Sequence, residues 1–277
     1  MSFLDKFTQR RQITGGILCV GLDPDLEKMP PKIAASPRPL YEFCRRVVEA
    51  TLPFAAAYKP NLAFFEAHGS GGIAQLERLM AEMPSDVPTI LDAKRGDIGN
   101  TARMYAQFLF GHLGGDAATV NPFLGRDSLE PFFEYPEKLP FVLCLTSNPG
   151  SSDIQMVVAG DQRIYQRIIV LLRRFHKPCG LVVGARHTEM LEDVRRLAGE
   201  WPILIPGVGT QGGDLTGAVQ AGTAGGLYPA IINVSRDILY ASQGDDFADA
   251  AAAKARWYTE EMAKALKKPP PLRKSAG

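Results

Sequence analysis

The segment TILDAKRGDIGNTA, residues 89–102, contains an apolar run that leads directly into four charged side chains within six residues. Asp92, Lys94 and Asp97 are spaced as D-x-K-x-x-D, so two carboxylates flank one ammonium group. Neighbouring carboxylates favour the protonated form of a lysine, and a protonated lysine held in place can donate a proton to a reacting atom. A Schiff-base lysine must instead be neutral when it attacks. The pattern therefore favours proton donation over imine formation.

Two other interpretations of this pattern require no chemistry. D-x-K-x-x-D is short, and it can arise as a structural ion-pair network or as a solvated run of surface charge. Lys59 lies in the preceding apolar run and supplies a second cation, which makes a nearly neutral array of alternating Lys and Asp. Because burying such an array contributes little to stability, we favour an active site.

A second group of residues is suited to binding an anion. The segments IPGVGTQGGD, residues 205–214, and INVSRD, residues 232–237, each follow an apolar run. Glycines let backbone N–H groups approach an anion closely, and Arg236 could add a bidentate contact. The same residues could instead form a flexible glycine-rich turn beside a surface arginine. Together with the charged array, the pattern favours a phosphate site.

Repeated elements must bring these groups together. Segments with helical spacing, such as residues 38–51, 99–113 and 188–199, separate short runs rich in Val, Ile and Leu. There are eight such runs, at residues 17–23, 56–64, 89–94, 117–123, 141–147, 180–185, 203–208 and 230–235. Eight strands alternating with helices predict a single-domain α/β protein, a (β/α)8 TIM barrel. Active sites of such barrels lie at the C-terminal ends of the strands, where these polar side chains occur.

Composition narrows the class of protein. The chain has 277 residues, 45% of them hydrophobic, and its 31 Lys and Arg nearly balance its 30 Asp and Glu. No overall field attracts nucleic acid or an anionic membrane, and we expect neither as a partner. The N-terminus has no apolar signal region, and nowhere is an apolar run long enough to span a membrane. The four cysteines are far apart and form no C-x-x-C pair, so we expect a cytoplasmic protein without a zinc site or disulfide framework.

We expect residues 1–266 to form the barrel and the basic, proline-rich residues 267–277 to form a mobile tail.

The charged segment resembles the signature of orotidine 5'-phosphate decarboxylases, in their longer bacterial (type 2) subgroup. The resemblance extends in order through VGLDPD (20–25), YKPNLAFFEAHG (58–69), LDAKRGDIGNTA (91–102), VNPFLGRDSLEPF (120–132), LTSNPGS (145–151) and PGVGTQGGD (206–214). It implies a TIM barrel that converts orotidine 5'-phosphate to UMP in pyrimidine biosynthesis, with no metal and no organic cofactor. In that reaction CO₂ leaves C6 of the pyrimidine, and the carbanion that remains is protonated by a lysine.

The resemblance implies a role for each residue of the charged array. Lys94 would be the proton donor, Asp92 would lie beside the scissile carboxylate, and Lys59 would order both. Asp97 would complete the array. In the family this aspartate and the threonine four residues on, here Thr101, reach into the partner subunit's active site, which implies a homodimer with shared sites.

The resemblance also implies which residues bind the rest of the substrate. Asp23 and Asn61 would lie near the ribose and Ser147 near the pyrimidine. The phosphate would be held by Gly209, Gln211 and Arg236. Two positions depart from the compact subgroup of the family: Asn61 has no counterpart there, and Ser235 precedes Arg236 where that subgroup has glycine.

Two rival functions stay open from the sequence. Sugar-phosphate enzymes of the same superfamily, such as hexulose-phosphate synthase and ketogulonate-phosphate decarboxylase, share D-x-K-x-x-D and use Mg²⁺, but they lack the lysine of the second strand, so Lys59 argues against them. The four histidines show no metal-ligand spacing. A catalytically dead barrel that only binds a nucleotide or sugar phosphate is a further alternative, disfavoured because every chemical position is filled.

Overall fold

The computed structural model describes residues 1–186, 188–209 and 214–267 of the chain. Eight parallel strands form one sheet in the order β2-β1-β10-β9-β8-β5-β4-β3. Bridges from Tyr58 to Thr89 and from Asn61 to Asp92 join β2 to β3, so the sheet curls into a nearly closed barrel. The strands are β1 (Leu18–Leu22), β2 (Ala57–Pro60), β3 (Ile90–Arg95), β4 (Ala117–Val120), β5 (Leu139–Leu145), β8 (Gly180–Val183), β9 (Ile203–Pro206) and β10 (Ala230–Val234). Each predicted apolar run overlaps one of them, which confirms the predicted (β/α)8 barrel.

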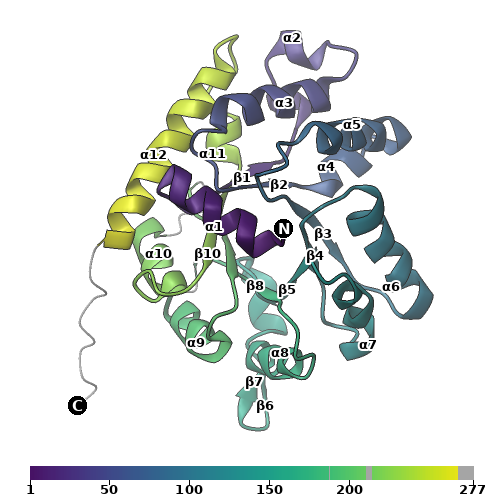
Figure 1. Cartoon of the computed structure of the whole chain (residues 1–277), viewed down its shortest axis with the longest axis vertical. Coiled ribbons are helices and arrows are strands. Elements are labelled where there is room, and N and C mark those ends of the chain that lie inside the picture. Colours follow the sequence, from purple (N-terminus) through teal and green to yellow (C-terminus); the bar gives the residue numbers. More distant parts are fainter. Residues whose placement is uncertain (187, 210–213, 268–277) are drawn as a thin grey trace.

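Helices surround the strands (Figure 1). They are α1 (Phe3–Thr14), α2 (Pro31–Ala34), α3 (Pro39–Thr51), α4 (Leu62–Glu66), α5 (Gly69–Glu82), α6 (Gly99–Ala106), α7 (Arg126–Leu129), α8 (Ile164–Arg173), α9 (Thr188–Ala198), α10 (Leu215–Thr223), α11 (Arg236–Leu239) and α12 (Phe247–Lys267). The three helices predicted at 38–51, 99–113 and 188–199 correspond to α3, α6 and α9. The second of these changes at residue 107 into a π-helical turn that ends at His112. In α3, proline at the first position starts the helix, and apolar residues spaced three and four apart are buried against the barrel.

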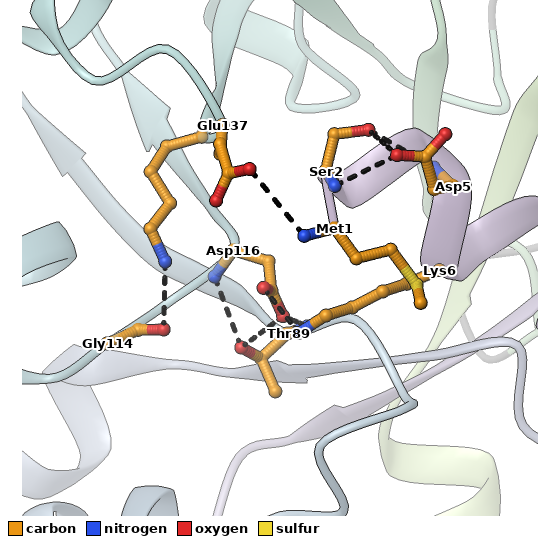
Figure 2. Close-up of polar contacts among 9 residues, drawn as sticks. Met1, Ser2, Asp5, Lys6, Thr89, Gly114, Asp116 and Glu137 are labelled. Atoms are coloured by element: carbon orange, nitrogen blue, oxygen red, sulfur yellow. Dashed lines mark hydrogen bonds and ion pairs between the residues drawn. The ribbon is translucent and has the colours of Figure 1, made fainter.

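Helix α1 covers the N-terminal end of the barrel, where it crosses the strands in Figure 1. Lys6 donates to Asp116 at 2.7 Å, and Asp116 in turn accepts the backbone N–H of Thr89 at 2.9 Å (Figure 2). Asp116 immediately precedes β4 and Thr89 immediately precedes β3. Phe3 and Phe7 are buried beneath the helix, and Phe3 meets Phe141 of β5 edge to face. With this end closed, the C-terminal ends of the strands are left for a site.

The last helix, α12, packs against α3, α10 and α11. It ends at Lys267, and the predicted tail beyond it lies outside the described residues. A short antiparallel hairpin, β6 (Val158–Ala159) with β7 (Gln162–Arg163), precedes α8. None of the helices described has both the length and the apolar character needed to cross a membrane.

Candidate active site

Asp92 lies at the centre of the charged array, near the C-terminal end of β3. Its Oδ2 accepts from Nζ of Lys59 at 2.5 Å, and its Oδ1 accepts from Nζ of Lys94 at 2.6 Å. The Lys59 and Asp92 side chains are 4% and 10% exposed, whereas that of Lys94 is 52% exposed. Each oxygen of one buried carboxylate is therefore paired with a different ammonium group, and one of the two cations faces solvent.

A local irregularity in β3 places Lys94 beside Asp92. The register between β3 and β4 shifts between Leu91 and Arg95, and Lys94 has a left-handed backbone with φ of 48°. This conformation costs free energy for a side chain larger than glycine, and such strain is concentrated at functional sites. The hydroxyl of Thr119 accepts the N–H of Lys94 at 2.9 Å and that of Ala93 at 3.0 Å. Thr119, on β4, therefore holds the irregular turn in place.

Electrostatics keep the buried pair charged. Burial acts to raise the pKa of Asp92, but the ion pairs with Lys59 and Lys94 outweigh it, so the pKa of this carboxyl lies well below its usual range. For Lys59 burial acts to lower the pKa, and the carboxylates of Asp92 and Asp23 outweigh it, so the pKa is raised. At neutral pH the pair is thus a carboxylate and an ammonium.

A cavity opens beside this array at the C-terminal ends of the strands. Its lining residues are Asp23, Lys59, Asn61, Asp92, Pro206, Gly207, Val208, Asn233, Val234, Ser235, Arg236 and Asp237. Oδ1 of Asp23 and Oδ1 of Asn233 are buried, and neither has a hydrogen-bond partner among the described residues. Buried acceptors without partners are uncommon in folded proteins, so these two are suited to hydroxyl or N–H donors of a ligand.

Close packing of β1 on β10 shapes this wall of the cavity. A Cβ atom on Gly21 would lie 1.9 Å from Oγ of Ser235, so no larger residue fits there without movement. The amide of Asn233 donates to the same hydroxyl at 3.3 Å. Neither Asn233 nor Asp237 was predicted from the sequence to be a site residue. Asn233 could have been noticed in the sequence, because it is a polar residue inside the apolar run AIINVS.

The side of the cavity predicted to bind phosphate is formed by the ends of β9 and β10. Gly207 and Val208 line it, and the exposed Arg236 opens α11 beside them. Gly209 has φ of 98°, and its Cα approaches the hydroxyl of Tyr258 so closely that a Cβ would lie 2.8 Å away. Gly209 itself does not line the cavity. The other predicted phosphate residue, Gln211, lies outside the described residues.

The acidic group nearest Arg236 in sequence is tied to the last helix. Asp237 accepts a hydrogen bond from the hydroxyl of Tyr258 at 2.7 Å, and Nζ of Lys254 lies 3.6 Å away. Both partners belong to α12. These contacts fix Asp237 and offset part of its negative charge beside the site predicted to bind an anion.

Besides Gly209, four predicted site residues in the described ranges are not among those that line the cavity, and they are Lys94, Asp97, Thr101 and Ser147. Lys94 reaches the cavity wall only through its ion pair with Asp92. Ser147 follows β5 and packs against Gly184, where a Cβ would come within 2.6 Å of it. Asp97 is half-buried and its carboxylate accepts the N–H of Ile98 at 2.8 Å. Thr101 is exposed on α6. Neither Asp97 nor Thr101 meets the cavity that contains Asp92.

No cluster of three or more His, Cys, Asp or Glu side chains in the described ranges could hold a metal ion. The cysteines are free and buried, and they are Cys19, Cys44, Cys144 and Cys179.

Comparison with known sequences gives one consistent result. Residues 16–253 match the family described as orotidine 5'-phosphate decarboxylase / HUMPS. The orotidine 5'-phosphate decarboxylase of Roseiflexus castenholzii is 47% identical over 254 residues, which cover 90% of this chain and 93% of the relative. That of Variovorax paradoxus is 46% identical over 266 residues, covering 92% of this chain and 96% of the relative.

Solved structures agree with the sequence comparison. The orotidine monophosphate decarboxylase of Leishmania donovani superposes with a TM-score of 0.80 at 38% identity, covering 97% of this chain and 100% of that one. The UMP synthase of the same organism superposes with a TM-score of 0.83 at 40% identity. That superposition covers 96% of this chain but only 57% of the longer synthase.

Proposed function

The chain belongs to the orotidine 5'-phosphate decarboxylase / HUMPS family, and we infer that it is an orotidine 5'-phosphate decarboxylase, which makes UMP in pyrimidine biosynthesis. One observation supports this assignment above the others. Asp92 is buried between the ammonium groups of Lys59 and Lys94, directly beside a cavity with unpartnered acceptors. Such an arrangement suits a substrate with a carboxylate to lose and hydroxyls to bind.

The proposed reaction begins with the substrate carboxylate placed against Asp92. The bond between C6 and the carboxylate carbon breaks, CO₂ leaves, and the electron pair stays on C6. Repulsion between the two carboxylates is relieved as CO₂ leaves and the negative charge moves from the substrate carboxylate to C6. Lys59 keeps Asp92 ionised, because its ammonium group is buried against the same carboxylate.

Lys94 completes the proposed reaction by donating its proton to the C6 carbanion. One proton is consumed for each CO₂ released, so orotidine 5'-phosphate and H⁺ give UMP and CO₂. The half-exposed amine can then recover its proton from solvent. The Lys94 ammonium group supplies the one proton that the reaction consumes, and the proposed steps use no metal ion and no organic cofactor.

Binding of the substrate's phosphate and ribose would supply the free energy that holds its carboxylate against that of Asp92. We assign the phosphate to Arg236 with backbone of the loop that contains Gly209 and Gln211. The ribose hydroxyls are assigned to the acceptors of Asp23 and Asn233, with Asn61 beside them. Ser147 is assigned to the pyrimidine, at the end of β5.

A homodimer with shared sites is proposed from the placement of α6. Thr101 and Met104 are three residues apart on one face of α6, Ile98 precedes the first residue of this helix, and all three are exposed. Two large exposed apolar side chains, Ile98 and Met104, at this end of the chain's third β/α unit favour contact with a second subunit. In that position Asp97 and Thr101 would reach the neighbouring chain's cavity. We propose that the enzyme acts in the cytoplasm, without nucleic acid or membrane as a partner.

The test is whether purified protein, treated with a chelator, consumes the absorbance of orotidine 5'-phosphate and releases UMP. Turnover that is unchanged by chelation supports the proposal. If orotidine 5'-phosphate is not consumed and a sugar phosphate is converted in the presence of Mg²⁺, the chain is instead one of the sugar-phosphate enzymes.

A further inference from the structure

Tyr240 holds the loop that carries Asp23. Its hydroxyl donates to the backbone carbonyl of Asp23 at 2.6 Å and accepts the backbone N–H of Asp25 at 2.7 Å. These two groups flank Pro24, directly after β1. One hydroxyl therefore fixes both sides of the turn from which the Asp23 carboxyl projects toward the cavity.

The same tyrosine belongs to the segment that carries Arg236. Its backbone N–H donates to the carbonyl of Arg236 at 3.1 Å, because it follows α11 by one residue. Its ring is stacked on Phe43, with ring centroids 5.8 Å apart, and Phe43 is stacked on Phe247 at 5.2 Å. The ring and the backbone of Tyr240 are thus both held, and its hydroxyl extends to the β1 loop.

The Tyr240 hydroxyl stays a donor under ordinary conditions. Burial raises its pKa, and the negative charge of Asp23 and Asp25 acts in the same direction. The loop N–H and C=O that it pairs would lose their partner if the hydroxyl were removed, while the ring could remain in its stack.

We propose that Tyr240 is a positioning residue, through which the segment that binds the substrate phosphate at Arg236 holds the Asp23 carboxyl at the ribose. The proposal rests on the function inferred above. A displacement of about 1 Å in a group that orients the substrate can cost a large factor in rate. Oδ1 of Asp23 is buried without a partner, so its contribution depends on where the loop places it.

The experiment is a double-mutant cycle with Tyr240→Phe and Arg236→Ala, measured as kcat/KM for orotidine 5'-phosphate. Two lost hydrogen bonds predict a fall of roughly 5- to 100-fold for Tyr240→Phe, mostly in KM. In the Arg236→Ala background, the factor by which Tyr240→Phe lowers kcat/KM should be at least threefold smaller. The reason is that the substrate phosphate no longer fixes the segment that carries residue 236 and Tyr240. Tyr41→Phe is the matched control, since that hydroxyl also makes a partly buried hydrogen bond, to Glu82 at 2.6 Å between α3 and α5.

A structural readout separates positioning from general destabilisation. Hydrogen exchange at the amide of Asp25 should quicken in Tyr240→Phe, and UMP should protect this amide in the wild type but much less in the variant. Tyr41→Phe should leave both unchanged. The coupling would be overturned if folded Tyr240→Phe protein had a kcat/KM within twofold of wild type. It would also be overturned if Tyr240→Phe lowered kcat/KM by the same factor with Arg236 present and with Arg236→Ala. If the wild type itself fails to turn over, the inferred function has failed, and this outcome is distinct from an active wild type with an unaffected variant.

Discussion

The hydroxyl of Thr119 on β4 donates a hydrogen bond of 2.9 Å to Oδ1 of Asp92 on β3. The same oxygen of Thr119 accepts the backbone N–H of Lys94. One side chain thus supports both the carboxylate and the turn that carries the proposed proton donor. Asp92 is held by three donors, two charged and one neutral.

Thr119→Val tests this support with almost no change in volume. The variant leaves the N–H groups of Ala93 and Lys94 without their acceptor, which should lower the free energy of unfolding by about 1–3 kcal/mol. Because the Lys94 turn would loosen, kcat should fall by roughly tenfold with a smaller effect on KM. Steady-state kinetics and denaturant titration measure the two effects, and an unchanged kcat would show that Thr119 has only a structural role.

The buried pair predicts a specific pH dependence of stability. The pKa of Asp92 is depressed in the folded protein, so its contribution is present above the unfolded pKa of about 3.9 and is lost as the pH falls below that value. Asp92→Asn leaves Lys59 buried without its carboxylate, which should cost about 3–5 kcal/mol at pH 7. The difference in unfolding free energy between wild type and Asp92→Asn should narrow between pH 4 and the lowest pH at which both fold. A difference that stays constant would argue against an ionised Asp92.

Arg236→Ala should mainly weaken phosphate binding. Loss of a hydrogen bond to a charged group predicts a rise in KM for orotidine 5'-phosphate of roughly 10- to 100-fold. The loss should be much smaller with orotidine, which has no phosphate. Equal losses with both substrates would remove Arg236 from the phosphate site.

The shared-site proposal predicts complementation between two inactive proteins. Asp97→Ala and Lys94→Ala subunits, mixed under conditions that exchange them, should give dimers in which one site has both substitutions and the other has none. With random pairing about half of the dimers are mixed, so activity should return to roughly a quarter of wild type. If mass measurements confirm exchange and no activity returns, Asp97 does not act across subunits.

The barrel and the charged array could be predicted because both follow from short-range patterns. Continuous apolar runs indicate buried parallel strands. Polar residues at the C-terminal ends of these strands lie close together at one end of the barrel, as Lys59 and Asp92 do. The sequence did not reveal the register shift in β3 or the left-handed backbone of Lys94, because both depend on how β3 pairs with β4.

The supporting residues were missed for a related reason. Thr119 and Asn233 are polar residues inside apolar runs, and Tyr240 lies after the last strand, so no local pattern shows which groups they contact. Two of these roles depend on contacts between residues far apart in sequence: Thr119 contacts Asp92, 27 residues away, and Tyr240 contacts Asp23, 217 residues away. The closure of the barrel by α1, through Lys6 and Asp116, was not predicted for the same reason.

Lys94 has the central role in the proposed mechanism, as the proton donor. Decarboxylation of orotidine 5'-phosphate by Lys94→Ala, compared with wild type and with Lys264→Ala as an exposed control lysine on α12, tests this directly. We predict a fall in kcat of ~10²–10⁴-fold or more in a variant whose circular dichroism and melting match a folded barrel, with the control unchanged. Turnover near that of wild type in folded Lys94→Ala protein would contradict the mechanism.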